Sequence, residues 1–338
     1  MRRRLLDFVI CPLCGGELAL GQDRSALDTV VVRATLICGE GHRFPVRAGV
    51  PRLLAQSASS CGDSRSIQDS FSREWGHFDY ERDRTWGQTA DRRRADFLSQ
   101  VDLSPQALAG LTVLDAGCGN GVLSAAISDF GCEVVAADIG HQVVEAHRHF
   151  TSLGIEHTHY LQADLMRPPF RPGAFDIVFC AGVLHHTPDT RQTLDGLVRA
   201  VADGGRIFVW LYHHVPGFLS NLKLRGRPVM AELPAPVKHA LVLGLLPQAL
   251  ARQRLRIARG RQDPATRLNP REKLITMLDS FTCRYRWEHT QEEVHGWYRE
   301  LGFVDIKTTE VGAWGFGVVA TRPSAAAQTG AHALQSAV

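Results

Sequence analysis

The sequence predicts an α/β protein with a doubly wound, mainly parallel sheet, a small cysteine-containing module before it and a helical insertion near its end. From residue 111 onward, apolar strand-like segments alternate with helical ones, and the first strand runs into a glycine-rich turn, TVLDAGCGNGVLSAAI. Such alternation is typical of parallel sheets, whose ligands bind beyond the carboxyl ends of the strands. The composition, 44% hydrophobic and 22% charged, is that of a globular protein.

The N-terminal module carries a set of metal ligands. A Cys-x-x-Cys pair stands in CPLCGG, and a Cys-x3-His pair follows in ICGEGHRF. Three thiolates and one imidazole suit a tetrahedral Zn²⁺ ion, and four protein ligands leave no open position for water. A redox Cys-x-x-Cys is the alternative, but it gives the second pair no role. The sequence therefore predicts a structural zinc site with the ligands Cys11, Cys14, Cys38 and His42, and strands around Val30, Val31, Val32, Thr35 and Ile37.

A short linker and a helical region connect this module to the sheet. Residues 56–66, QSASSCGDSRS, are small and polar, which predicts a linker. Residues 66–101 have a helical pattern and carry five aromatic residues: Phe71, Trp75, Phe78, Tyr80 and Trp86. These aromatic side chains either roof an active site or pack helices onto the sheet. The arginine run at 92–94 predicts a solvated face.

The glycine-rich turn has the form D-x-G-x-G-x-G and contains Asp115, Gly117, Gly119 and Gly121. A dinucleotide fingerprint would place its third glycine where Val122 stands, and no Gly-Lys-Ser/Thr follows for a phosphate loop. Glycines let a ligand approach the backbone, and the helix N-terminus can receive a carboxylate. The acidic residue before the loop suits an amino group and a sulfonium better than a pyrophosphate.

On these motifs the chain resembles the class I S-adenosylmethionine (SAM)-dependent methyltransferases over residues 111–212 and 290–322. The resemblance implies an enzyme, SAM as cofactor and a Rossmann-like seven-stranded sheet. It assigns Asp138 in VVAADIG to the ribose hydroxyls, Asp164 in LQADL to the adenine amine, and the end of FDIVFCAGVLHH to the neighbourhood of the methyl donor. The implied cofactor-binding residues are Asp115, Gly117, Gly119, Gly121, Asp138, Ile139, Ala163, Asp164, Leu165 and Cys180.

The first 55 residues have a resemblance of their own. CPLCGGEL and ICGEGHRFPVRAGVPRLL resemble the zinc ribbon of some bacterial ribosomal RNA guanine methyltransferases and the small zinc-ribbon activator protein of tRNA and rRNA methyltransferases. The predicted organisation is a zinc ribbon at 1–56, a linker and N-terminal helices at 57–110, and a methyltransferase domain at 111–322 with a lid insertion at about 213–289. A disordered tail is expected at 323–338, because it is small and low in charge.

Two adjacent histidines are the predicted catalytic residues. Methyl transfer depends chiefly on alignment of the acceptor, and a base is needed only when the acceptor must lose a proton. His185 and His186 follow the fourth strand and are predicted either to supply that base or to shape the turn. The Asn-Pro-Pro-aromatic signature that amino-group methyltransferases often carry is replaced here by CAGV from Cys180, which favours a carbon or oxygen acceptor.

The insertion leaves the substrate class open. It contains VKHALVLGLLPQALARQRLRIARGR, an apolar helical stretch followed by arginines, which predicts a lid over a small hydrophobic substrate, a surface that rests on lipid, or an RNA-binding face. LHHTPD resembles methyltransferases of quinone and natural-product biosynthesis and favours a small, apolar metabolite. The alternatives are an RNA methyltransferase that binds rRNA or tRNA through its ribbon, and a noncatalytic SAM-fold binding module.

The sequence also predicts a cytoplasmic protein. In MRRRLLDFVI the apolar run is interrupted by Asp7 and then by Cys11, too soon for an export signal. An apolar stretch long enough to cross a bilayer is absent, which predicts no integral membrane association. The net charge of +3 does not select a partner, and the oligomeric state is not predicted.

Overall fold

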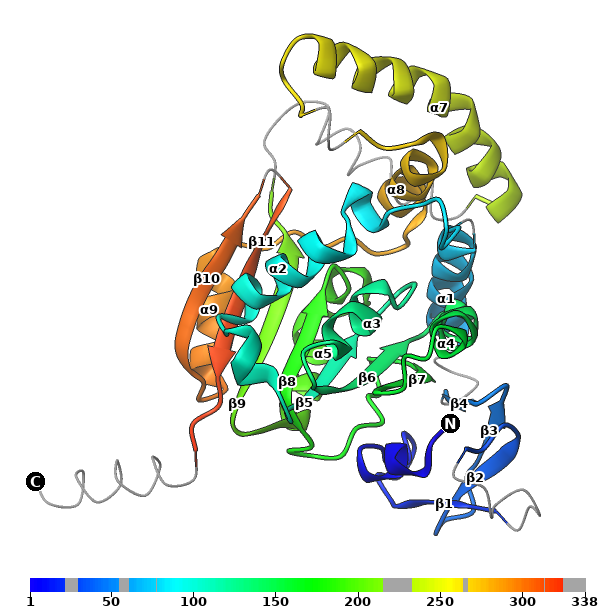
Figure 1. The fold of residues 1–338 in the computed structure, drawn as a ribbon, viewed down its shortest axis with the longest axis vertical. Helices are drawn as coiled ribbons and strands as arrows, with labels where there is room; N and C mark the ends of the chain where they lie inside the picture. Colours follow the sequence, from blue (N-terminus) through cyan, green and yellow to red (C-terminus); the bar gives the residue numbers. More distant parts are fainter. Residues whose placement is uncertain are drawn as a thin grey trace, which may run out of the picture.

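The computed structural model describes residues 1–21, 30–54, 61–76, 78–214, 233–263, 267–312 and 314–324 (Figure 1). Its described strands form one sheet in the order β1-β2-β3-β4-β7-β6-β5-β8-β9-β11-β10. The strands are β1 (Leu18–Leu20), β2 (Ala34–Cys38), β3 (Arg43–Arg47), β4 (Val50–Leu53), β5 (Thr112–Ala116), β6 (Glu133–Asp138), β7 (Thr158–Ala163), β8 (Phe175–Ala181), β9 (Val201–Tyr212), β10 (Val304–Val311) and β11 (Gly315–Thr321).

Strands β5 to β11 form the predicted doubly wound sheet, in the order β7-β6-β5-β8-β9-β11-β10. Neighbouring strands from β7 to β9 are parallel, whereas β11 is antiparallel to both β9 and β10. Strands β6 and β7 are buried almost throughout, as expected for parallel strands covered on both faces. The seven-stranded α/β prediction is confirmed.

Helices cover this sheet and extend beyond it. Figure 1 shows α2 and α3 in front of the sheet and α9 behind it. The α-helices are α1 (Cys61–Trp75), α2 (Ala90–Val101), α3 (Val122–Ser128), α4 (Gln142–Ser152), α5 (Thr190–Leu197), α7 (Ala235–Ala258), α8 (Pro270–Thr282) and α9 (Gln291–Glu300). Short 3-10 turns include η1 (Arg3–Asp7), η3 (Thr85–Gly87) and η5 (Leu184–His186).

The N-terminal ribbon, strands β1 to β4, is continuous with the main sheet. Its last strand, β4, pairs in parallel with β7, so that Arg52 lies opposite Gln162 and Leu53 opposite Ala163. The predicted ribbon strand is confirmed at Thr35 and Ile37, which lie in β2. It is wrong at Val30–Val32, because β2 begins at Ala34 and Val30 forms only an isolated bridge with Arg2. Val30 and Val32 are exposed, so they have no second layer to pack against.

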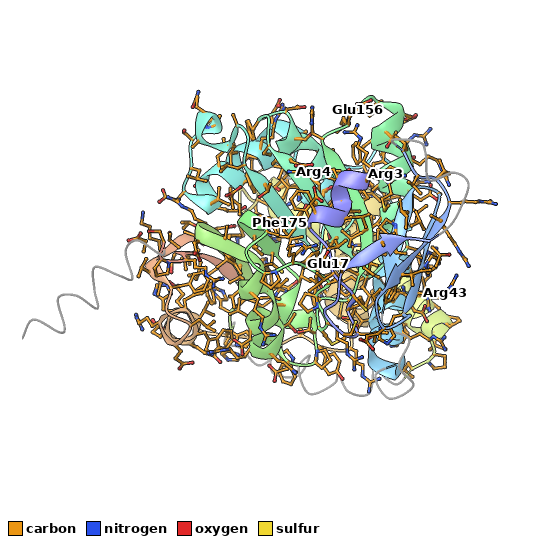
Figure 2. All side chains as sticks on the ribbon, turned by 90° about the horizontal axis from the view of Figure 1, so that it is seen from below. Arg3, Arg4, Glu17, Arg43, Glu156 and Phe175 are labelled. Atoms are coloured by element: carbon orange, nitrogen blue, oxygen red, sulfur yellow. The ribbon has the colours of Figure 1, made fainter. Side chains whose placement is uncertain are left out.

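The ribbon also packs against the underside of the main domain (Figure 2). Phe8, directly after η1, is buried and stacks on Phe175 of β8 with ring centroids 5.5 Å apart. Charged pairs surround this contact: Arg2 with Glu156 at 2.8 Å, Arg4 with Glu133 at 3.3 Å, and Arg171 with Glu17 at 2.6 Å. Because the pairs are partly exposed, the apolar contact carries most of the docking energy.

The region before the main sheet corrects two further expectations. Helix α1 begins at Cys61, inside the predicted linker, and the predicted helix over 66–101 is broken between α1 and α2. Within the break, the Asp83 carboxylate accepts from the Asp79 backbone N–H, which replaces the helical pattern with a side-chain-capped turn. Residues 325–338 of the predicted disordered tail lie outside the described residues, as does the side chain of Trp86.

The insertion contributes α7 and α8, which lie beyond the sheet at the end remote from strands β1 to β3 (Figure 1). They pack through a small apolar cluster containing Val242, Leu274, Met277 and Leu278. Asn269 caps α8 in a capping box with Glu272, and Glu272 also accepts from the Arg84 backbone N–H at 2.7 Å. None of the described helices combines the length and apolar character that crossing a bilayer requires.

Candidate active site

The glycine-rich loop joins β5 to α3 in a conformation that needs glycine. Gly117, Gly119 and Gly121 have φ of +89°, +55° and +71°. A Cβ on Gly117 would lie 2.2 Å from Val183 Cγ2, and one on Gly119 would lie 3.1 Å from the Trp75 ring. The loop is therefore held by neighbours on both sides at the carboxyl end of β5.

Asp115 lies in β5 just before this loop and is buried. The Ser124 hydroxyl donates to Asp115 Oδ2 at 2.5 Å. Burial raises the pKa of Asp115 from 3.8 to about 6, against the opposing effects of the Ser124 hydrogen bond and the Arg93 charge. Because burial disfavours ionisation of this carboxylate, a cation bound beside it would stabilise the ionised form.

Asp138 ends β6 and ties the neighbouring loops together. Its Oδ2 accepts from the Gly119 backbone N–H at 2.9 Å, and its Oδ1 accepts from Gly140 N–H and Gln142 Nε2, both at 2.8 Å. Burial raises the pKa of Asp138, while these hydrogen bonds oppose the shift. Ile139, the next residue, offers its carbonyl to Gln68 and Gln162 at 2.9 Å.

Asp164 directly follows β7, the third strand of this group. Its Oδ1 accepts from the Met166 backbone N–H at 3.0 Å, and its Oδ2 accepts from the Ser64 hydroxyl at 2.7 Å. Ala163 and Leu165 on either side are buried. The structure thus brings Asp115, Asp138 and Asp164 to the carboxyl ends of adjacent strands.

Helix α1 covers this edge, and its polar contacts were missed by the sequence analysis. Ser64 bonds Asp164, Gln68 bonds the Ile139 carbonyl, and the Ser72 hydroxyl accepts from the His141 backbone N–H at 3.0 Å. Trp75 lies against Gly119. The only signal in the sequence was the aromatic pattern, which left a roof and simple packing both open.

Arg93 of α2 is a second residue that the sequence analysis did not single out. It stands in the run predicted to be a solvated face, but its Nε is buried and has no hydrogen-bond partner among the described residues. Burial lowers the Arg93 pKa, and the negative charge of Asp115 opposes this shift. A half-buried guanidinium within the field of Asp115 is a ready partner for an anionic group.

The two histidines of η5 are buried in an aromatic cluster. The ring centroids of His185 and Tyr212 are 4.2 Å apart, and those of His186 and Phe71 of α1 are 5.5 Å apart. His186 Nδ1 donates to the Tyr285 carbonyl at 2.8 Å, because a carbonyl can only accept. Its Nε2 lies 3.3 Å from Asp279 Oδ1 of α8.

Asp279 connects the insertion to this histidine turn. Its Oδ2 accepts from the Tyr212 hydroxyl at 3.0 Å. Burial alone would raise the Asp279 pKa, but the adjacent His186, the Tyr212 hydroxyl and the Arg286 charge outweigh burial and hold the pKa below its usual value. Helix α8 is therefore attached to the turn after β8 by a buried polar contact.

Cys180, a predicted cofactor-binding residue, lies in β8 with its side chain buried in the main core. Burial raises the pKa of its thiol far above the ordinary value. At neutral pH the group is a protonated thiol that packs as an apolar side chain.

The four predicted metal ligands converge at one end of the ribbon. His42 Nδ1 lies 3.5 Å from Cys11 Sγ and 3.3 Å from Cys38 Sγ, and Cys14 Sγ lies 3.6 Å from Cys38 Sγ. Tetrahedral zinc with bonds of about 2.3 Å to sulfur and 2.0 Å to nitrogen places its ligand atoms at about these separations. The donor set and its spacing fit a zinc ion.

Comparison with known proteins agrees with this architecture. Residues 114–209 match the family model of a methyltransferase domain, and residues 2–49 match that of Trm112p-like proteins. The first match covers β5 to β9 of the parallel sheet, and the second contains the four converging metal ligands.

Similar curated proteins are bacterial enzymes. The ubiquinone biosynthesis O-methyltransferase of Xanthomonas euvesicatoria is 29% identical over 133 residues, 39% of this chain and 56% of that protein. The Xylella fastidiosa 9a5c protein of the same name is 36% identical over 120 residues, 34% of this chain and 46% of that protein. The chain thus spans about half the length of the curated relatives it matches.

Solved structures resemble the chain more remotely. Magnesium protoporphyrin IX methyltransferase from Synechocystis, with bound S-adenosylhomocysteine, is 20% identical, with a TM-score of 0.46 over 76% of this chain and 98% of that one. The 1,6-didemethyltoxoflavin-N1-methyltransferase of Burkholderia thailandensis is 16% identical, with a TM-score of 0.44 over 86% of this chain and 96% of that one.

Proposed function

We propose that the chain is a SAM-dependent methyltransferase that transfers a methyl group to oxygen or carbon of a small, apolar, quinone-like metabolite. The observation that carries the proposal is the convergence of Asp115, Asp138 and Asp164 on neighbouring strand ends beside the glycine-rich loop. Similarity to ubiquinone biosynthesis O-methyltransferases supports an oxygen acceptor.

Bound SAM supplies a methyl group already activated as a sulfonium. In this proposal Asp138, with Ile139 beside it, holds the ribose hydroxyls, and Asp164 between Ala163 and Leu165 accepts from the adenine amine. The backbone of the glycine-rich loop receives the amino-acid end. The charge of Asp115 favours the cationic cofactor, and Arg93 is placed to attract its carboxylate.

Alignment of the acceptor falls to the elements that cover the strand ends. Helix α1 contacts the loops after β5, β6 and β7, and α8 contacts the turn after β8. Together they would exclude water and hold an apolar ring near the methyl donor. Proton removal by His185 or His186 remains a prediction for a hydroxyl acceptor. Cys180, behind the same strand end, is proposed to pack beneath the cofactor.

The ribbon is proposed to hold one structural Zn²⁺ through Cys11, Cys14, Cys38 and His42. Four protein ligands close the coordination shell, so this ion would stabilise the fold and take no part in the reaction. A cytoplasmic location likewise remains a prediction.

The test uses purified protein, methyl-labelled SAM and host extract separated into RNA, protein and small-molecule fractions. Label in an organic-extractable, ribonuclease-resistant fraction would support the proposal. Label that is lost on ribonuclease treatment would refute the proposal and would indicate that the chain methylates RNA bound through the ribbon. Binding of SAM with no label in any fraction would make the chain a binding module.

A matched pair of glycine variants controls this experiment. Gly119→Ala places a Cβ against Trp75 at positive φ, so it should weaken SAM binding and labelling together. Gly296→Ala, in α9, meets no atom within 4 Å and should leave both unchanged.

A further inference from the structure

A second cluster of metal-ligating side chains lies between the turn after β8 and the lid helix. His186, Asp279 and Cys283 are 3%, 7% and 3% exposed, and one donor atom from each lies within 4.8 Å of the other two. His186 comes from η5, whereas Asp279 and Cys283 are one helical turn apart at the end of α8. Cys283 is the C-cap residue directly after α8, and its Sγ lies 3.8 Å from the carboxylate of Asp279, on the same side as the histidine.

The distances within this cluster resemble those of the ribbon site. His186 Nε2 lies 3.3 Å from Asp279 Oδ1, and Cys283 Sγ lies 3.8 Å from the same oxygen. The corresponding edges in the ribbon measure 3.3 to 3.6 Å. Tetrahedral zinc gives edges of about 3.3 Å between nitrogen and oxygen and about 3.5 Å between sulfur and oxygen.

The outer contacts orient these side chains as metal ligands are usually oriented. His186 donates through Nδ1 to the Tyr285 carbonyl, which turns Nε2 toward the cluster. This buried Nε2 has no aligned hydrogen-bond partner among the described residues, although Asp279 Oδ1 is close. The other Asp279 oxygen accepts from the Tyr212 hydroxyl. Carbonyl and hydroxyl partners of this kind fix the orientation of ligating histidines and carboxylates.

A simple ion pair between His186 and Asp279 is the competing explanation. An ion pair would be strongest with the ring N–H aimed at the carboxylate, and it would need no thiol. The observed Nε2 is instead unaligned, and the Cys283 thiol approaches the same oxygen at 3.8 Å. A metal ion binds all three groups at once. Because it occupies His186 Nε2 while Nδ1 donates to the Tyr285 carbonyl, it leaves His185 as the candidate base.

We propose that His186, Asp279 and Cys283 form a second divalent-metal site of the zinc type, separate from the ribbon. Imidazole, carboxylate and thiolate are all zinc ligands, and three protein ligands leave a fourth position for water or a substrate oxygen. Binding releases the thiol proton of Cys283 to solvent and forms a Cys283 Sγ–metal bond. The ion fastens α8 to the end of β8, and thus fixes the lid over the strand ends.

The test is metal content of the full chain, which does not depend on methyltransferase activity. The protein is loaded with excess Zn²⁺, dialysed against a weak chelator and analysed by mass spectrometry for zinc. The expected content is two zinc ions per chain, falling to one in Cys283→Ser and in Asp279→Asn. Cys132→Ser, which changes a buried thiol outside both clusters, should retain two.

A second measurement guards against misfolded variants. Tyr212→Phe keeps all three ligands and removes only the hydroxyl that orients Asp279, so it should still bind two zinc ions. Its second ion should be about tenfold weaker in competition with a chromophoric chelator. Wild-type protein with one zinc ion, lost in Cys38→Ser but retained in Cys283→Ser, would overturn the proposal. Two ions in both wild type and Cys283→Ser would overturn it equally.

Discussion

Replacing Asp115 with asparagine should stabilise the cofactor-free protein at neutral pH and weaken its affinity for SAM. Burial raises the Asp115 pKa from 3.8 to about 6, so the folded chain retains a proton that the unfolded chain releases in this range. The stability that this group contributes is therefore present at low pH and lost as the pH rises through about 6. Relative to low pH, the raised pKa lowers the free energy of unfolding by up to about 3 kcal/mol at pH 7.5 and by about 1.6 kcal/mol at pH 5.

Urea denaturation of wild type and Asp115→Asn without SAM, at both pH values, measures this cost. Asparagine can still accept from the Ser124 hydroxyl, so the buried hydrogen bond is kept. The variant should gain the most stability at pH 7.5, and its advantage should shrink by about 1.4 kcal/mol at pH 5. Asp129→Asn, at an exposed carboxylate, is the control and should change little at either pH. A variant less stable than wild type at pH 7.5, or an advantage independent of pH, would refute the reasoning.

Three further outcomes are expected. Gly117→Ala should weaken SAM binding at least about tenfold in calorimetry, because its Cβ would lie 2.2 Å from Val183 and its φ is +89°; unchanged affinity would contradict the loop geometry. Phe8→Ala should lower the free energy of unfolding by about 3 kcal/mol in urea, because it removes the buried ring that stacks on Phe175; a loss below about 1 kcal/mol would show that the ribbon is not packed there. Asn269→Ala should cost about 1 kcal/mol in the same assay, because it removes the N-cap of α8, and no loss would mean that the cap is not formed.

The main sheet could be predicted because its information is local. Each parallel strand is a short apolar segment, and the glycines stand where the backbone takes positive φ. The ribbon ligands were equally predictable from their spacing, and the structure brings the four together. In both cases the informative residues lie within short segments of the sequence.

The missed features depend on contacts between distant segments. Helix α1 starts in a Ser- and Gly-containing stretch with poor helix propensity, and contacts such as Ser64 with Asp164 compensate. Arg93 is indistinguishable in sequence from its exposed neighbour Arg92. The approach of Asp279 to His186 depends on how the insertion folds back, which no local pattern encodes.

The pairing of β4 with β7 gives the ribbon a second structural role, at the edge of the main sheet. Without it, β7 would be an edge strand with unpaired backbone groups next to Asp164, open to pairing with another chain. The ribbon covers this edge at Gln162 and Ala163, next to Asp164, and places β1, which has only three residues, at the outer edge of the sheet. Deleting the ribbon should therefore yield a protein that self-associates through β7, and the module serves as a guard against aggregation as well as a metal-binding unit.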